Sequence, residues 1–159
     1  MDPILQIKDL QTHFFTKAGV LKAVDGVSLE IGAGEIVGLV GESGSGKSIT
    51  GFSIMGLVDA PGRIVGGQIL FKGQDLAKLS PTEMQAYRGN RIAMIFQDPM
   101  MTLNPVLRIE TQMVETILSH DSSVSKIDAR TRARDALGLV GISSPDERLR
   151  AYPHQFSGG

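Results

Sequence analysis

Residues 41–48 read Gly41-Glu42-Ser43-Gly44-Ser45-Gly46-Lys47-Ser48 and fit the pattern G-x-x-x-x-G-K-[ST] at every fixed position. The glycines allow the backbone to curl so that successive N–H groups point inward around an anion. A lysine and a hydroxyl follow at once, and in such loops these groups contact the outer phosphates and Mg²⁺ of a nucleotide. The stretch therefore predicts a phosphate-binding loop.

The flanking sequence supplies the context that this loop requires. The apolar run at residues 36–40 precedes it and predicts a strand, and residues 49–58 follow with helical character. A helix that starts near Gly46 would add unpaired N–H groups and the positive end of its dipole. The alternative is a glycine-rich turn that contains a lysine by chance, and it explains neither the strand nor the helix.

The composition of the sequence excludes several classes of protein and of functional site. The 159 residues suit one domain or most of one, and 42% hydrophobic with 21% charged residues is ordinary for a soluble globular chain. A net charge of −1 gives no global field that would attract nucleic acid or an acidic membrane. The absence of cysteine excludes disulfides, thiolate metal sites and cysteine nucleophiles within this sequence. No apolar run approaches the roughly 18 residues of a membrane span, and the N-terminus lacks the pattern of a secretory signal.

The region before the loop predicts strands. Residues 4–15, 20–24 and 27–31 have extended character, with a turn signal at 17–19, and the last of them alternates apolar and polar residues. These three short strands predict an antiparallel sheet beside the nucleotide-binding core. After the first helix, Pro61-Gly62 and Gly66-Gly67 indicate a turn ahead of a strand at 68–71.

The second half of the chain is mainly helical in pattern. Ser80 and Glu83 form a capping box with a proline between them, which predicts a helix that ends around Gly89. Residues 92–96 are an apolar run typical of a buried strand. From about residue 105 to 150 the apolar period becomes helical, and a second capping box at Ser125 and Asp128 predicts a helix to about Leu139.

Two further segments have distinctive sequences. Residues 96–105 read Phe96-Gln97-Asp98-Pro99-Met100-Met101-Thr102-Leu103-Asn104-Pro105, and the chain closes with Tyr152-Pro153-His154-Gln155-Phe156-Ser157-Gly158-Gly159. With an aromatic strand and the phosphate loop ahead of them, these segments follow one another in the order of an ABC transporter ATP-binding subunit. The chain resembles that family over essentially its whole length. The sequences of these segments are similar to those of the bacterial dipeptide and oligopeptide importers.

The resemblance implies roles for individual residues. Gln97 matches the glutamine that senses the γ-phosphate, Mg²⁺ or the attacking water, although a glutamine at a strand end is also compatible with a purely structural role. Ser157, Gly158 and Gly159 match the signature motif, which presents a hydroxyl and N–H groups to the nucleotide of the opposite subunit. Without the upstream loop, these three residues would read as a flexible turn.

The adenine contact is expected from the first strand. Phe14 is the expected stacking aromatic by its offset from Asp9 and Leu10, and Phe15, on the opposite face of the same strand, is the alternative. Packing in the core is an alternative role for either ring.

The expected site is thus assembled from the loop and these motifs. Lys47 and Gln97 are the expected catalytic residues, and Ser48 and Gln97 the expected contacts of Mg²⁺. The expected ATP-binding residues are Phe14, Gly41, Ser43, Gly44, Ser45, Gly46, Lys47, Ser48, Ile49, Ser157, Gly158 and Gly159.

The expected fold is α/β, a P-loop NTPase core with an N-terminal antiparallel β subdomain and a helical subdomain. Residues 1–97 would hold the β subdomain and the phosphate-loop core, and residues 98–159 the glutamine loop, the helical subdomain and the start of the signature motif. The resemblance implies a second ATPase subunit, transmembrane permease subunits and, indirectly, an extracytoplasmic substrate-binding protein as partners. It places the protein at the cytoplasmic face of the membrane, bound peripherally, with no nucleic-acid partner.

The family pattern continues beyond the signature with an Mg²⁺-binding aspartate, a catalytic glutamate and a switch histidine, which this sequence does not contain. We therefore expect a fragment of a longer protein whose core lacks its C-terminal half. Such a piece should bind nucleotide weakly, hydrolyse it at no useful rate and expose sheet edges. The alternatives are a soluble ABC-type ATPase acting on DNA or ribosomes, a non-catalytic nucleotide-binding module and, more distantly, a phosphate-loop kinase.

Overall fold

The computed structural model describes residues 3–97 and 102–156 and divides the chain into two compact units, Met1–Met94 and Ile95–Gly159. The first unit contains β1 (Leu5–Thr16), β2 (Gly19–Ile31), α1 (Lys47–Ile54), β3 (Gly62–Phe71), β4 (Gln74–Asp75), η1 (Leu76–Lys78) and α2 (Pro81–Gln85). The second contains α3 (Ile109–His120), α4 (Lys126–Leu139), α5 (Pro145–Leu149) and η3 (Pro153–Gln155).

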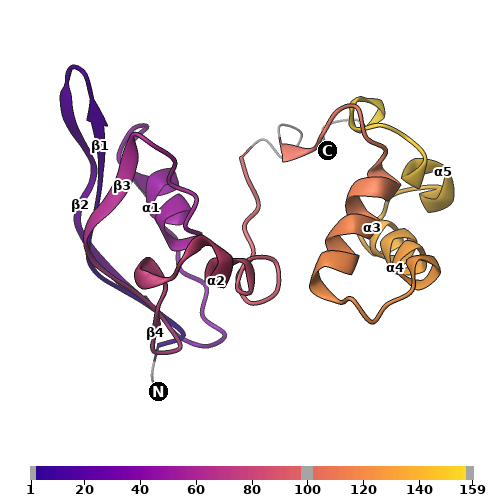
Figure 1. Ribbon diagram of the computed structural model, residues 1–159, viewed down its shortest axis with the longest axis horizontal. Helices are drawn as coiled ribbons and strands as arrows, with labels where there is room; N and C mark the ends of the chain where they lie inside the picture. Colours follow the sequence, from indigo (N-terminus) through magenta and orange to yellow (C-terminus); the bar gives the residue numbers. More distant parts are fainter. Residues whose placement is uncertain (1–2, 98–101, 157–159) are drawn as a thin grey trace. The chain divides into compact units, whose positions relative to one another are not determined.

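One antiparallel sheet organises the first unit, with the strand order β2-β1-β3-β4 (Figure 1). A tight turn at residues 17–18 joins β1 and β2 into a long hairpin, which pairs from Leu5 opposite Ile31 to Thr16 opposite Gly19. The two predicted strands at 20–24 and 27–31 are therefore one continuous strand. The prediction of a break was wrong because the strand passes Gly26 as a bulge of β2, and the pairing with β1 resumes on both sides, Leu10 opposite Val27 and Gln11 opposite Asp25.

A bulge in β1 explains Gly66-Gly67. Asp9 has a positive φ of 47° at the bulge, and its backbone N–H donates to Ser28 Oγ at 2.8 Å. Gly67, with a φ of 85°, passes so close that a Cβ there would overlap the Asp9 carbonyl oxygen. These glycines lie inside β3 rather than in the predicted turn before it, because the strand needs them to cross the bulge.

The core of the first unit lies between the sheet and the segments that pack on it. Its buried members are Ile7, Leu10, Val24, Ile69, Leu76 and Met84. Full burial of a side chain such as Leu10 or Ile69 contributes about 2 kcal/mol to folding. The Ser80 capping box is confirmed: Ser80 Oγ accepts from the Glu83 N–H, and the Glu83 carboxylate accepts from the Ser80 N–H at 2.8 Å.

Residues 36–40 are irregular and exposed. The prediction of a strand there was wrong, because these residues form no strand hydrogen bonds within the described part of the chain. Ile36 is 98% exposed and Val40 is 93% exposed. Residues 93–96 are likewise irregular, and Ile92 makes only a single bridge to Arg88. A strand is held by hydrogen bonds to a neighbour, and within the described residues no strand lies beside either segment.

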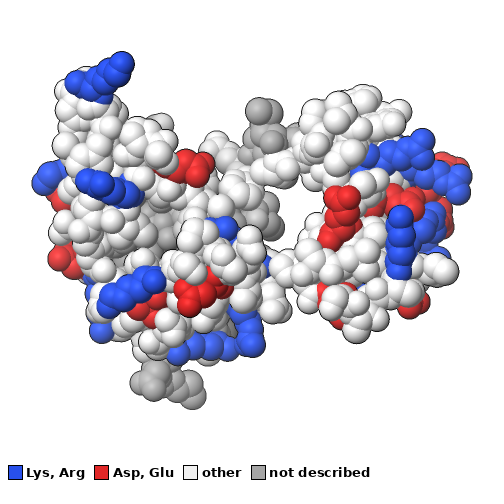
Figure 2. All heavy atoms as spheres, viewed as in Figure 1, with Lys and Arg blue, Asp and Glu red and all other residues white. Residues whose placement is uncertain are grey.

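The second unit is helical, as predicted. Ile109, Ala133, Leu137 and Leu149 form its buried core, contributed by α3, α4 and α5. Ser125 caps α4 by accepting from the Asp128 N–H at 3.1 Å, which confirms the N-cap of the predicted capping box; the Asp128 carboxylate accepts from the Ser125 hydroxyl at 2.7 Å rather than from its backbone N–H. Figure 2 shows basic and acidic side chains interleaved on this unit. Arg130 contacts Glu110 at 3.2 Å and Asp146 at 3.1 Å. No helix in the part of the chain that the structure describes is long and apolar enough for a membrane span.

Candidate functional site: the phosphate loop

The phosphate loop leads directly into α1, which begins at Lys47, next to Gly46 where the start was predicted, and ends at Ile54, four residues before the predicted end at Val58. The N-cap is Gly46, whose φ of 90° lies in the left-handed region and whose carbonyl oxygen accepts from the Thr50 N–H at 2.8 Å. No side chain caps this helix end. The first N–H groups of α1 therefore remain available to an anion, which is the arrangement that favours phosphate binding.

Two glycines are required by the shape of the loop. Gly44 has a φ of 83°, a conformation that side chains of L-residues rarely adopt. At Gly46 the constraint is also steric, because a Cβ would overlap the carbonyl oxygen of Ala23 in β2. The loop thus lies directly against the sheet.

Lys47 extends back over the loop that precedes it. Its ammonium donates to the carbonyl oxygens of Gly41 and Glu42, each at 2.7 Å, and to Ser45 Oγ at 3.2 Å. This places a half-buried positive charge inside the curl of the backbone, beside the N-terminus of α1. A phosphate in the curl would meet both the ammonium and the helix N–H groups, so the residues present fit the triphosphate of a nucleotide.

α1 is fixed to the sheet by a buried polar contact. Thr12 Oγ1 of β1 and Ser53 Oγ of α1 lie 2.8 Å apart, and both residues are almost completely buried. Ser53 Oγ also donates to the Ile49 carbonyl at 2.7 Å. Ile49 packs against the core of the first unit. The helix that carries the loop is therefore held rigidly against β1.

The opposite end of α1 is held by an arginine. Arg88, from the turn after α2, donates through Nε to the Met55 carbonyl at 2.7 Å and through a terminal nitrogen to the Gly56 carbonyl at 2.5 Å. A cation at the C-terminus of a helix complements its dipole. Sequence reasoning missed this residue, because nothing in the pattern around Arg88 indicates a long-range partner.

Ser43 and Ser48 are exposed. The Ser48 hydroxyl sits in the first turn of α1 and makes no hydrogen bond to the described residues. It is an oxygen donor of the type that Mg²⁺ accepts together with phosphate oxygens and water. Within residues 3–97 and 102–156, no group of three His, Cys, Asp or Glu side chains could hold a metal by itself.

Phe14 and Phe15 have different surroundings. Phe14 is half-buried, and its ring packs on the backbone of Gly62, where a Cβ would lie 2.6 Å from the ring edge and 2.8 Å from Val58 Cγ1. Phe15 is 38% exposed, and the Arg63 guanidinium lies 4.1 Å from its ring centroid. Both rings project from β1, the strand whose Thr12 side chain contacts α1.

The remaining expected site residues lie apart from the loop in the sequence. Gln97 is exposed, in a bend at the start of the second unit. Ser157, Gly158 and Gly159 lie outside the described residues. The segment just before them contacts Arg148, which donates to the Gln155 carbonyl at 3.4 Å and whose guanidinium lies 5.7 Å from the Phe156 ring centroid.

Comparison with known proteins gives a consistent family. A family model described as ABC transporter matches residues 24–159. The dipeptide transport ATP-binding protein of Bacillus subtilis is 48% identical over 160 residues, which cover 100% of this chain and 48% of the relative. The corresponding Escherichia coli protein is 46% identical, over 98% of this chain and 47% of the relative. The chain thus spans about half the length of the relatives it matches.

Solved structures give the same fold. A bacterial ABC transporter cassette solved as a dimer superposes with a TM-score of 0.82 at 24% identity, covering 97% of this chain and 63% of the cassette. The same cassette in a post-hydrolysis state bound to ADP and Pi gives a TM-score of 0.80 at 23% identity, with the same coverage. The antiparallel sheet and the helices of this chain are therefore those of an ABC cassette.

Proposed function

Because the chain belongs to the ABC transporter family, we propose that it is the nucleotide-binding part of an importer ATPase that couples ATP binding and hydrolysis to peptide uptake. The observation that carries this proposal is the loop at residues 41–46, with the Lys47 ammonium held among the loop oxygens at the N-terminus of α1. Peptides are the proposed cargo, since the relatives at 42–48% identity include proteins named for dipeptide and oligopeptide transport.

We propose that the loop holds the triphosphate of ATP. The N–H groups of Gly44 and Gly46, with those at the start of α1, would donate to the β- and γ-phosphates, whereas the Ser45 N–H donates to the Glu42 carbonyl at 3.2 Å. Lys47 would exchange its carbonyl partners for phosphate oxygens, a change from neutral to charged acceptors that strengthens each hydrogen bond. Ser48 would offer its hydroxyl to Mg²⁺, which supplies charge neutralisation at the phosphates when it is bound.

The adenine ring is proposed to stack on Phe14. Its ring is backed on one side by Gly62 and Val58, so its orientation is fixed before any base arrives. Phe15 already carries the Arg63 guanidinium over its ring. A base that used Phe15 would have to displace that cation.

The site is proposed to be completed by other parts of the assembly. Gln97 would respond to the γ-phosphate and Mg²⁺, and its amide suits a sensor because it donates and accepts without a change of charge. Ser157, Gly158 and Gly159 would contact the nucleotide of a second ATPase subunit. Permease subunits would bind the pair at the cytoplasmic face of the membrane, with a substrate-binding protein on the other side.

The proposal is tested in proteoliposomes that contain the natural full-length protein with its permease subunits. Addition of peptide and the substrate-binding protein should stimulate ATP hydrolysis and drive peptide into the lumen. Lys47→Ala should lower hydrolysis by on the order of 10²-fold, as expected when a group that stabilises developing charge is removed.

Lys17→Ala is the matched control, since Lys17 lies in the exposed turn between β1 and β2. It should leave both hydrolysis and uptake unchanged. A rate of ATP hydrolysis that does not change with peptide or permease, but rises when DNA or ribosomes are added, would contradict the proposal.

A further inference from the structure

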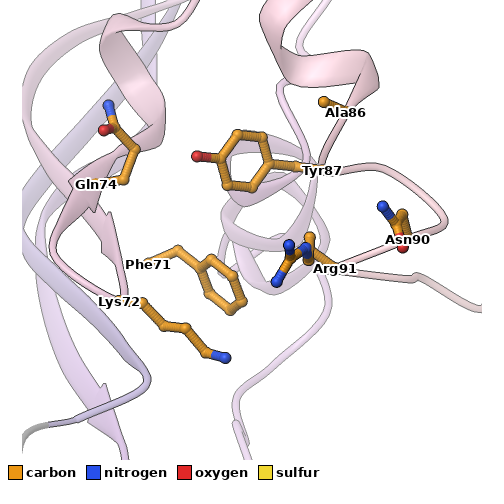
Figure 3. Close-up of a pocket in the computed structure, with 7 residues that line it drawn as sticks. All are labelled: Phe71, Lys72, Gln74, Ala86, Tyr87, Asn90 and Arg91. Atoms are coloured by element: carbon orange, nitrogen blue, oxygen red, sulfur yellow. The ribbon is translucent and has the colours of Figure 1, made fainter.

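The first unit has a hollow that none of the phosphate-loop residues lines. It has a volume of about 410 Å³. The end of β3 and the start of β4 form one wall, and the turn that follows α2 forms the other (Figure 3). Its lining residues are Phe71, Lys72, Gln74, Ala86, Tyr87, Asn90 and Arg91. The volume is within the range of sites that hold a small organic molecule.

An aromatic pair forms the apolar part of the hollow. The rings of Phe71 and Tyr87 meet edge to face, with centroids 6.2 Å apart and an interplanar angle of 83°. Both residues are half-buried and pack against the core of the first unit, so their positions are fixed by the fold. Such a pair presents both a ring face and a ring edge to a flat guest.

Two cations stand beside this pair. Figure 3 shows Lys72 and Arg91 reaching toward the Phe71 ring from the two walls, and the Lys72 ammonium lies 5.8 Å from the ring centroid. No carboxylate is among the seven lining residues. Neither cation forms an ion pair within residues 3–97 and 102–156, whereas Arg130, Arg132 and Arg134 each have a carboxylate partner.

The backbone places Lys72 at the rim in spite of a conformational cost. Lys72 and Gly73 form the tight turn between β3 and β4, and both have positive φ, 48° and 84°. Such turns favour asparagine or glycine at the first position, so the Lys72 backbone adopts a conformation that a lysine rarely takes. The Lys72 N–H donates to the Ile4 carbonyl at 2.9 Å, which ties the turn to the chain before β1.

The second wall is also held by backbone contacts. The Tyr87 carbonyl accepts from the N–H groups of Arg91 at 2.8 Å and Ile92 at 2.9 Å. The adjacent Arg88 is bonded to the carbonyls that end α1. The walls are therefore preformed, which lowers the entropic cost of binding.

We propose that this hollow binds a small organic anion that carries a flat ring, as in an aromatic or heterocyclic phosphate or carboxylate. The anionic group contacts Lys72 and Arg91, and the ring packs on Phe71 and Tyr87. The carboxamides of Gln74 and Asn90 line the hollow as hydrogen-bonding groups for a polar ring edge. The site is independent of the phosphate loop and of the proposed transport activity.

The experiment is a calorimetric titration of the natural full-length protein with four probes: phenyl phosphate, benzoate, phenol and inorganic phosphate. Phenyl phosphate, benzoate or both should bind more tightly than phenol and inorganic phosphate, because only they combine ring and charge. Preference for one of the first two identifies the anionic group as phosphate or carboxylate. Failure of both to bind overturns the proposal.

Variants assign the binding to the hollow. The double substitution Lys72→Met and Arg91→Met should weaken binding by on the order of 100-fold, since each of the two charge-assisted contacts accounts for about 10-fold. The matched control is Lys17→Met with Arg150→Met, which removes the same charge from exposed positions outside the hollow and should change nothing. Equal effects of the two double variants would overturn the proposal.

Lys47→Ala separates this site from the phosphate loop. It should leave binding of the ring-bearing anion intact even where it abolishes nucleotide binding. Loss of probe binding in Lys47→Ala, with retention in the Lys72 and Arg91 double variant, would show that the probe occupies the phosphate loop instead.

Discussion

Gly46 at the start of α1 lies against the carbonyl oxygen of Ala23 in β2, so closely that a Cβ on residue 46 would overlap that oxygen. The loop is therefore shaped by the sheet as well as by its own glycines. A shift of Gly46 or of the Ala23 carbonyl would change the direction of the first N–H groups of α1. These are the groups that are proposed to bind phosphate.

Gly46→Ala should abolish nucleotide binding and destabilise the fold. The substitution combines the cost of a positive φ, about 1 kcal/mol, with an overlap against backbone that cannot relax easily. Gly34→Ala is the matched control, because Gly34 also has a positive φ, of 73°, but open space where the Cβ would be. Thermal melts and Mg-ATP titrations of both variants would distinguish overlap from conformation. Equal losses in the two would show that the contact with Ala23 is unimportant.

The Thr12–Ser53 hydrogen bond should couple the sheet to the loop helix unequally. Ser53 Oγ already donates to the Ile49 carbonyl, so in this pair Thr12 is the donor and Ser53 the acceptor. Ser53→Ala leaves the buried Thr12 hydroxyl with no acceptor and should lower the free energy of unfolding by about 1–3 kcal/mol. Thr12→Val should lower it less, because the Ser53 hydroxyl still donates to the Ile49 carbonyl. The double variant should cost less than the sum of the two. Denaturant unfolding of all four proteins gives these values, and strict additivity would argue against the contact.

Local motifs allowed much of this fold to be predicted. The start of α1 at Lys47 and the caps at Ser80 and Ser125 depend on neighbours within four residues along the chain, and the Lys47 contacts within the phosphate loop span at most six, so a sequence displays them directly. Residues 36–40 were predicted as a strand from their apolar composition. That composition fits a buried strand, but the strand forms only where a neighbour offers hydrogen bonds.

Long-range contacts could not be predicted in the same way. The bulge at Asp9 and the passage of Gly67 beside it depend on register between strands that are distant in sequence. Arg88 and the hollow beside Phe71 and Tyr87 depend on the fold bringing a turn next to a helix end and a hairpin. In sequence, Arg88 and Arg91 are two basic residues of a polar turn, and nothing distinguishes their roles.

Arg88→Met should destabilise the first unit. It removes two hydrogen bonds from a charged donor to the carbonyls of Met55 and Gly56, and each such bond contributes about 1.5–3 kcal/mol. Arg91→Met is the control, since the exposed Arg91 side chain has no ion pair among the described residues. Chemical denaturation should show a lower midpoint for Arg88→Met alone. A similar midpoint shift in both variants would contradict the role of Arg88 at the end of α1.

The capping box at α2 should make stability sensitive to acid. The hydrogen bond from the Ser80 hydroxyl, followed by that from the Ser80 N–H, lowers the pKa of the Glu83 carboxyl below its usual value. A lowered pKa in the folded state stabilises the fold above the unfolded pKa, about 4.3, and this contribution is lost as pH falls through the folded pKa.

The difference in melting temperature between the natural protein and Glu83→Gln should therefore be largest near neutral pH and shrink as pH falls below about 4. Asp59→Asn is the control, because Asp59 is exposed and its side chain makes no hydrogen bond within the described residues. A difference for Glu83→Gln that stays constant from neutral to acid pH would show that the carboxylate plays no part in the cap.

Calorimetric titration of Mg-ATP into the natural full-length protein tests the central claim most directly, with Lys47→Ala and Lys17→Ala as the compared variants. The structure predicts binding by the natural protein and by Lys17→Ala, and a loss of at least about 10-fold in affinity for Lys47→Ala, since the ammonium inside the loop supplies a charged hydrogen bond to phosphate. Absence of Mg-ATP binding by the natural protein, or equal affinity in all three proteins, would contradict the assignment of residues 41–48 as a nucleotide site.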